Sequence, residues 1–351
     1  MAAAGASDFR ALEATNRRET VILVIVFTVI VAALGLGLDF LAGDFAIVDG
    51  QVVGFPVLAV AAIFLATIQA LVSFYGGASL VLLSVHAKEL TPDTVQHQAV
   101  LDVIREMALA ARMPMPKAYV MDDPSVNAFS SGRDPAHSVI CVTQGLVDQM
   151  DREELQGVIG HEMAHVRDYD IRTMTMIAVL VGGVAMLSDF IYRVMFFGGF
   201  RGGGRGGRGG SKGNGDAGAI VAIAVLVLAV VAPLFAQLIA MAVSRQREYL
   251  ADAGSVEFTR NPLALLRALE QIAKVESPLR EGTAGTAHLF IVNPREGVRE
   301  DGERFFNNLF STHPPLARRI ERLRAMAGAA VPSTGAPPHG ATQAPASGAN
   351  R

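Results

Sequence analysis

The chain has 351 residues, 51% of them hydrophobic, and its mean hydropathy of +0.37 is high for an ordinary soluble protein. A formal net charge of −3 gives no overall field that would select nucleic acid or acidic partners. The single cysteine, Cys141, excludes an internal disulfide and any multi-thiolate metal site, so a bound metal has to use histidine and carboxylate ligands.

Four uncharged apolar segments are candidates for membrane-spanning helices, because a span needs about 20 largely apolar residues. They cover residues 20–38, 54–85, 173–188 and 217–244, and the third reaches spanning length only by continuing toward Tyr192. An alternative for the first segment is the hydrophobic region of a signal peptide. We expect about four membrane helices, with the full crossing of the third and fourth left open.

The charges around the first segment predict its orientation. Arg10, Arg17 and Arg18 precede it, whereas residues 39–53 contain three aspartates and no lysine or arginine. The positive-inside rule therefore places the N-terminus in the cytoplasm, and the second segment returns the chain there. Residues 86–172 are charged and soluble-looking, so a site within them is expected to face the cytoplasm.

This pattern predicts six regions, and it leaves open the roles of the connector 198–216 and of the C-terminal tail. The connector 198–216 is rich in glycine and arginine; a flexible linker and an RNA-binding tract are the alternatives, and no nucleic-acid partner is expected. The regions are an N-terminal stretch 1–19, a membrane hairpin 20–85, a first soluble part 86–172, a second membrane hairpin 173–244, a second soluble part 245–326 and a disordered tail 327–351.

The soluble parts predict an α+β fold that is mainly helical with a small β-sheet. Asp151 and Glu154 have the spacing of a capping box at a helix start, about two and a half turns before His161. The remaining expected elements are strands at 117–121 and 138–143 with a turn at 132–135 between them, and helices at 262–274 and 314–326.

The most informative feature is His161-Glu162-Met163-Ala164-His165, an H-E-x-x-H motif. On a helix, positions i and i+4 share a face, so both imidazoles can reach one zinc ion. Glu162, beside the first histidine, is then placed to act as general base on a water at the metal. The alternative is a pair of histidines on a solvated helix face.

A third ligand is expected downstream, where Glu248 and Asp252 stand one helical turn apart. Two histidines and one glutamate leave zinc an open position, and an acid next to a ligand can orient an imidazole from behind. On residue chemistry alone, Glu248 can equally pair with Arg245 or Arg247 on the helix surface.

Taken together, the motifs resemble the M48 family of membrane zinc metallopeptidases, in particular its HtpX-type heat-shock proteases of bacterial inner membranes. The resemblance covers roughly residues 20–326, and four motifs follow one another in the family's order. They are Asn127-Ala128-Phe129 with Ser130-Ser131-Gly132, the H-E-x-x-H motif with Asp170, Arg247-Glu248-Tyr249-Leu250-Ala251-Asp252, and Ser311-Thr312-His313-Pro314-Pro315.

The resemblance implies a gluzincin-like domain with one Zn²⁺ per chain. By this similarity the ligands are His161, His165 and Glu248, the base is Glu162, and Asp252 orients a ligand.

The resemblance also implies roles for two further positions. Asn127, Ala128 and Phe129 are similar to the family's substrate-binding edge strand; an ordinary hairpin corner is the alternative. His313 is a candidate oxyanion donor, unless Ser311 or Thr312 simply caps the last helix.

The expected function is an ATP-independent zinc endopeptidase of the inner membrane that cleaves misfolded or unfolded, chiefly membrane, proteins at the cytoplasmic surface of the bilayer. No G-x-x-x-x-G-K-[ST] sequence for nucleotide binding occurs in the chain. The alternative is a four-span membrane protein with a structural zinc that acts as a non-proteolytic holdase or a transporter-like protein.

Overall fold

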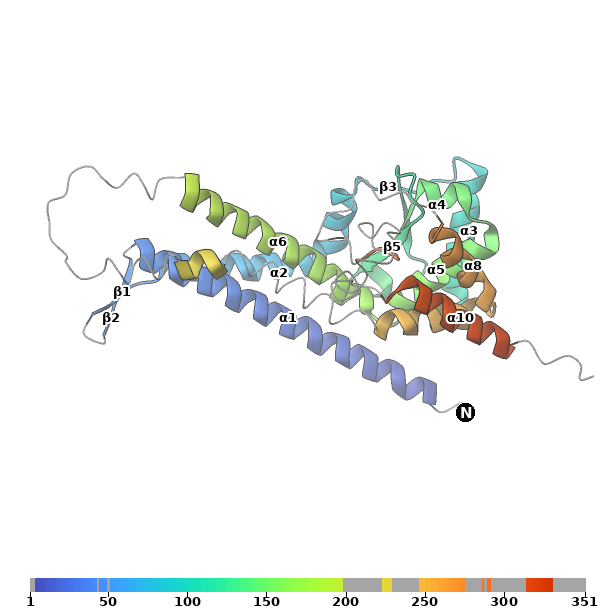
Figure 1. Cartoon of the computed structure of the whole chain (residues 1–351), viewed down its shortest axis with the longest axis horizontal. Helices are drawn as coiled ribbons and strands as arrows, with labels where there is room; N and C mark the ends of the chain where they lie inside the picture. The colour runs from blue at the N-terminus through green and yellow to red at the C-terminus, as the bar shows by residue number, and fades with distance from the viewer. Residues whose placement is uncertain are drawn as a thin grey trace, which may run out of the picture.

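The computed structural model describes residues 4–42, 44–48, 51–197, 223–228, 246–274, 286, 289–291 and 314–330. It is elongated, with three long helices side by side at one end and a part that holds the main sheet at the other (Figure 1). Within the described residues, the expected mainly helical α+β fold with membrane helices and a small sheet is confirmed.

The long helices are α1 (Ala4–Ala42), α2 (Val57–Ser84) and α6 (Asp170–Phe197), and each is long and apolar enough to cross a membrane. Their facing side chains form a shared apolar core that includes Phe27, Ala66 and Leu180. Small residues permit close approach, since a Cβ on Gly35 would lie 2.7 Å from the Cα of Ala59.

A two-stranded hairpin of β1 (Phe45–Val48) and β2 (Gln51–Gly54) connects α1 to α2. The buried Asp39 of α1 accepts hydrogen bonds of 2.8 Å from the backbone N–H groups of Leu58 and Ala59. This carboxylate satisfies donors at the start of α2, where a helix has no backbone partners of its own. Asp39 therefore ties the end of α1 to the start of α2.

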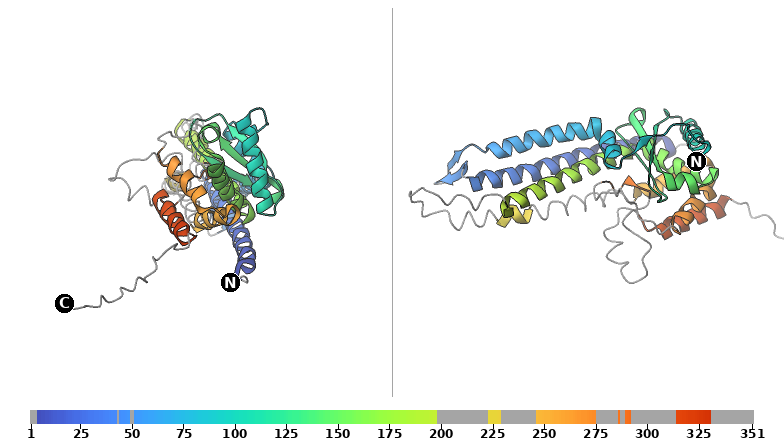
Figure 2. Two further views of the ribbon diagram at one scale, coloured as in Figure 1. Left: turned by 90° about the vertical axis from the view of Figure 1, so that its right-hand side faces the viewer. Right: turned by 90° about the horizontal axis from the view of Figure 1, so that it is seen from above.

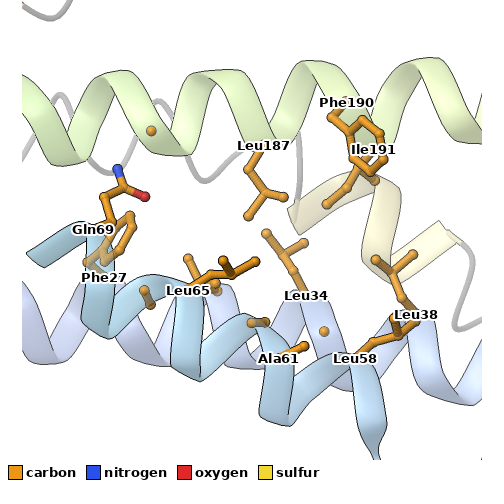
Figure 3. A pocket seen from close by; sticks show the side chains of 15 residues that line it. Phe27, Leu34, Leu38, Leu58, Ala61, Leu65, Gln69, Leu187, Phe190 and Ile191 are labelled. Atoms are coloured by element: carbon orange, nitrogen blue, oxygen red, sulfur yellow. The ribbon is translucent and has the colours of Figure 1, made fainter.

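The three membrane helices enclose a pocket of about 310 Å³ (Figure 3). Its wall is apolar except for Gln69, whose amide donates to the carbonyl of Val179 at 3.3 Å. Of the fourth predicted span, only residues 223–228 are described; they are helical, and Val225 packs with Leu34 and Ile191. The rest of that span and the Gly/Arg-rich connector lie outside the described residues.

The main sheet has four strands in the order β3-β4-β6-β5. Strands β4 and β6 run parallel, and β3 and β5 pair antiparallel at the two edges. The predicted strands at 117–121 and 138–143 are confirmed as β4 and β6. The four strands are β3 (Lys88–Glu89), β4 (Lys117–Met121), β5 (Ala128–Gly132) and β6 (Ser138–Thr143).

Helices pack on this sheet around one apolar core. The capping box at Asp151 and Glu154 is confirmed. Gly157 lets α5 meet α8 closely, because a Cβ there would lie 2.4 Å from the backbone nitrogen of Leu265. Beside α8 lies α10 (Figure 2). The elements are α3 (Val95–Ala110), α4 (Gln144–Gln149), α5 (Arg152–Arg167), a helix at 246–259, α8 (Pro262–Ile272) and α10 (Leu316–Ala330).

Several helix boundaries differ from expectation, and α8 ends two residues early, at Ile272. Helix α1 begins at Ala4, well before the apolar segment, and α6 is a full-length helix rather than a marginal one. The last helix starts at Leu316 and runs to Ala330, four residues into the predicted tail, because the Ala-rich sequence there favours helix; residues 331–351 lie outside the described residues.

Candidate metal centre

Helix α5 presents the H-E-x-x-H side chains inside the molecule. The rings of His161 and His165 are edge to face, with centroids 4.8 Å apart, and both side chains are almost completely buried. Glu162, between them, is also buried. These histidines therefore do not lie on a solvated helix face.

Glu248, from the helix at 246–259, completes a three-residue cluster. Its two carboxylate oxygens lie 3.5 Å from Nε2 of His161 and 3.5 Å from Nε2 of His165. Within the described residues, one ligand atom from each of these three side chains lies within 4.8 Å of the others. Zinc bonds of about 2.0–2.1 Å in tetrahedral geometry separate neighbouring ligand atoms by roughly 3.3 Å, so this donor set fits a metal ion.

The other nitrogen of each imidazole faces an acid. Nδ1 of His161 lies 3.1 Å from Asp252, and Nδ1 of His165 lies 3.1 Å from Asp170. Such contacts fix the ring orientation and keep Nε2 directed at the metal position. Asp252 comes from the helix that carries Glu248, whereas Asp170 opens α6.

Arg319 of α10 brings a positive charge to the site, and the sequence motifs did not indicate it. Its buried guanidinium donates to both oxygens of Asp252, at 2.7 and 3.1 Å. It also lies 3.2 Å from Glu248 and donates to the carbonyl of Ile291 at 3.0 Å. The sequence did indicate that Arg319 is buried, because Arg319 lies one helical turn before Leu323 and so shares its inward helix face.

These contacts set the charge of the cluster. Burial lowers the pKa of His165, but hydrogen bonds to Asp170 and Glu248 outweigh it and raise this pKa well above its usual value. Burial raises the pKa of Asp252, yet the charge of Arg319 and hydrogen bonds hold it below the usual value. Burial alone would lower the pKa of Arg319, but the charges of Asp252 and Glu248 raise it by more than burial lowers it. The guanidinium therefore stays charged.

Glu162 points to the edge strand. The hydroxyl of Ser130 on β5 donates to Oε2 of Glu162 at 2.6 Å. Because Asn127 accepts a backbone hydrogen bond from Thr143, the antiparallel alternation turns the backbone groups of Ala128 and Ser130 away from β6. The outer edge of β5 therefore runs past Glu162.

The outer edge is partly covered by the chain itself. The backbone N–H of Ile291 donates to the carbonyl of Ala128 at 3.0 Å. Phe290 packs on Phe129 with ring centroids 5.0 Å apart. Of the residues predicted to bind substrate, Ala128 and Phe129 begin the edge strand β5 and Asn127 directly precedes it; all three side chains are buried. His313 lies outside the described residues.

Comparison with known proteins agrees with this geometry. Residues 95–327 match the model of peptidase family M48. A protease HtpX homolog from Streptococcus uberis is 37% identical over 313 residues, which are 89% of this chain and 98% of that protein. The protease HtpX homolog from Streptococcus mutans serotype c is 40% identical over 310 residues, 88% of this chain and 97% of that one.

Among solved structures, the chain is similar to the crystal structure of Ste24p from S. mikatae. It has a TM-score of 0.43 and 19% sequence identity, and the match covers 74% of this chain and 57% of that one. The family assignment rests on the family model and the sequence relatives. The chain belongs to peptidase family M48 and is a membrane metallopeptidase.

Proposed function

We propose that this chain is a zinc-dependent endopeptidase that cleaves misfolded or unfolded proteins at the cytoplasmic surface of a bacterial inner membrane. The observation that carries the proposal is the meeting of His161, His165 and Glu248 beside the buried Glu162. Two nitrogens and one carboxylate leave a fourth tetrahedral position, which is typical of catalytic zinc sites.

The side chains around this cluster suit peptide hydrolysis. Zinc bound there would polarise the scissile carbonyl and lower the pKa of a bound water. Glu162, held by Ser130, takes the proton of the attacking water and delivers it to the leaving amine, with no acyl-enzyme. Asp252 and Asp170 hold the two ligating imidazoles from behind. His313 stays a candidate oxyanion donor.

The edge of β5 supports an extended substrate. A peptide can add its backbone to the outward N–H and C=O groups of Ala128 and Ser130, a mode open only to an unfolded or extended chain. The hydrogen bond from Ile291 has to open before a substrate reaches the Ala128 carbonyl. Without a nucleotide-binding motif in the sequence, the enzyme depends on substrates that are already unfolded, which supports a role in protein quality control.

The charges at the two ends of α1 support the cytoplasmic orientation. Arg17 and Arg18 lie at the end of α1 near the metal centre, whereas the far end carries Asp39 and is followed by Asp44 and the β1–β2 hairpin. The positive-inside rule then places the metal centre in the cytoplasm, next to the bilayer.

The test is Glu162→Gln in full-length protein purified in detergent, with an unfolded casein as substrate and zinc content measured on the same sample. We expect one zinc per chain and loss of cleavage, because glutamine keeps the shape but cannot accept the proton. The matched control is Glu153→Gln, an exposed glutamate on the same helix, which should cleave like the wild type. Undiminished cleavage by Glu162→Gln would refute the proposed base.

A non-proteolytic holdase with a structural zinc is the competing function. Such a protein would bind zinc and keep unfolded proteins soluble, and Glu162→Gln would not change this holdase activity. Wild-type protein that binds zinc but cleaves neither casein nor unfolded membrane proteins would therefore favour the holdase over the peptidase.

A further inference from the structure

The N-terminal end of the first membrane helix reaches the metal centre. Helix α1 runs on past the other two long helices, alongside the part that holds the main sheet (Figure 1). There the buried amide of Asn16 donates to the backbone carbonyl of Asp168 at 2.7 Å and to Oδ1 of Asp170 at 2.9 Å. A side chain more than 150 residues away in sequence thus contacts the acid behind His165.

The carboxylate of Asp170 is shared between the imidazole and α1. Its Oδ2 lies 3.1 Å from Nδ1 of His165, while Oδ1 accepts from Asn16 and lies 3.4 Å from Nε of Arg247. Arg247 in turn pairs with Glu19 of α1. Both oxygens are therefore engaged, and the plane of the carboxylate is fixed by Asn16 of α1 together with Arg247.

We propose that Asn16 is a positioning residue of the metal centre, which fixes Asp170 and through it the imidazole of His165. The inference rests on the proposed function, because it takes His165 as a zinc ligand. It makes α1 a part of the catalytic unit as well as a membrane anchor. Groups that hydrogen-bond to a ligating histidine influence metal affinity or activity by about 10- to 100-fold. Asn16 is one hydrogen bond further from the metal than Asp170, so its effect should be near the lower end of this range.

The chain offers a control for simple attachment of α1. Thr20, one turn along the same helix, is buried and exchanges a hydrogen bond of 3.0 Å with Thr173 of α6. The Thr20 hydroxyl also donates to the backbone carbonyl of Asn16 at 2.8 Å, so its contacts tie α1 to α6 and involve neither the side-chain amide of Asn16 nor Asp170. Thr20→Val should therefore weaken the attachment and leave the zinc site unchanged, whereas Asn16→Leu removes the donor to the carboxylate.

The experiment compares full-length Asn16→Leu, Asn16→Asp and Thr20→Val with the wild type in detergent. Zinc affinity is measured by competition with a chelating dye, and the visible spectrum of the cobalt(II)-substituted protein reports the ligand field at His165. We expect roughly tenfold weaker zinc binding for Asn16→Leu and a changed cobalt spectrum. Asn16→Asp should be weaker still, because it sets a second carboxylate against Asp170, and it also serves if Asn16→Leu does not fold.

Each outcome has one meaning. Equal zinc affinity and cobalt spectra in all four proteins would overturn the role of Asn16 while leaving the peptidase intact. Equal losses in Asn16→Leu and Thr20→Val would also overturn it, since attachment of α1 alone would then explain both. Wild-type protein that neither binds zinc nor cleaves casein would instead refute the proposed function.

Discussion

Replacing Arg319 by methionine removes a buried cation that contacts both Asp252 and Glu248. The guanidinium is 1% exposed, donates to Asp252 at 2.7 and 3.1 Å and lies 3.2 Å from Glu248. Breaking a buried ion pair from one side typically costs about 3–5 kcal/mol, because the remaining charge has no compensation. We expect a loss of this size in the metal-free protein.

Bound zinc should reduce the loss. Glu248 would then face the metal charge instead of Arg319, so only Asp252 keeps an unfavourable environment. The assay is thermal unfolding of the full-length protein in detergent, once with a chelator and once with zinc. A loss of about 3–5 kcal/mol corresponds to a fall of roughly 10 °C in the metal-free midpoint for a unit of this size.

The control is Arg324→Met on the same helix. Its side chain is 64% exposed and pairs with Glu270 at the surface, where an ion pair contributes about 0–1 kcal/mol. If Arg319→Met and Arg324→Met unfold at the same temperature without metal, Arg319 does not compensate the buried acids and the reasoning fails.

Two further predictions concern the base and the ligands. Ser130→Ala should lower kcat by about tenfold with KM and zinc content little changed, because a hydrogen bond to a charged group contributes about 1.5–3 kcal/mol. Ser130→Thr should restore kcat. An unchanged kcat in Ser130→Ala would show that the hydrogen bond from Ser130 does not assist Glu162. Since the pKa of His165 is raised in the metal-free fold despite burial, through Asp170 and Glu248, zinc binding at pH 7 should release protons. The stability that protonated His165 gives the metal-free fold is present below about pH 6.5 and lost as pH rises through the raised pKa, whereas zinc affinity rises over the same window. Calorimetry in buffers of different ionisation enthalpy checks this, and zero proton release would contradict it.

Elements with local signals were predictable from the sequence. The capping box at Asp151 depends on residues three apart, and strands β4 and β6 are rich in β-branched residues. Strand β5 contains small polar residues without that preference, and its pairing with β6 decides its conformation. Helix α3 has a Thr94 cap and buried apolar side chains at helical spacing, so its sequence also contains a local indication of a helix.

Contacts between distant segments were not predictable. The motif fixes the distance between His161 and His165, because both lie on one helix, and Glu248 with Asp252 follows the same local rule. No local rule indicates that Arg319 meets Asp252, 67 residues earlier in the chain. The sequence therefore indicated the candidate ligands and the candidate base, and tertiary packing supplied the groups that hold them.

The acids behind the two histidines are held by opposite ends of the chain. Asp252, behind His161, is bound by Arg319 of α10, and Asp170, behind His165, is bound by Asn16 of α1. Neither α1 nor α10 contributes a ligand among the described residues, yet each fixes one side of the cluster. On the role proposed for Asn16, a fragment that starts after α1 retains all three ligands and the base but leaves Asp170 without its amide donor. The position of the metal centre at the end of the membrane helices is then a requirement of its geometry as well as of its access to substrates.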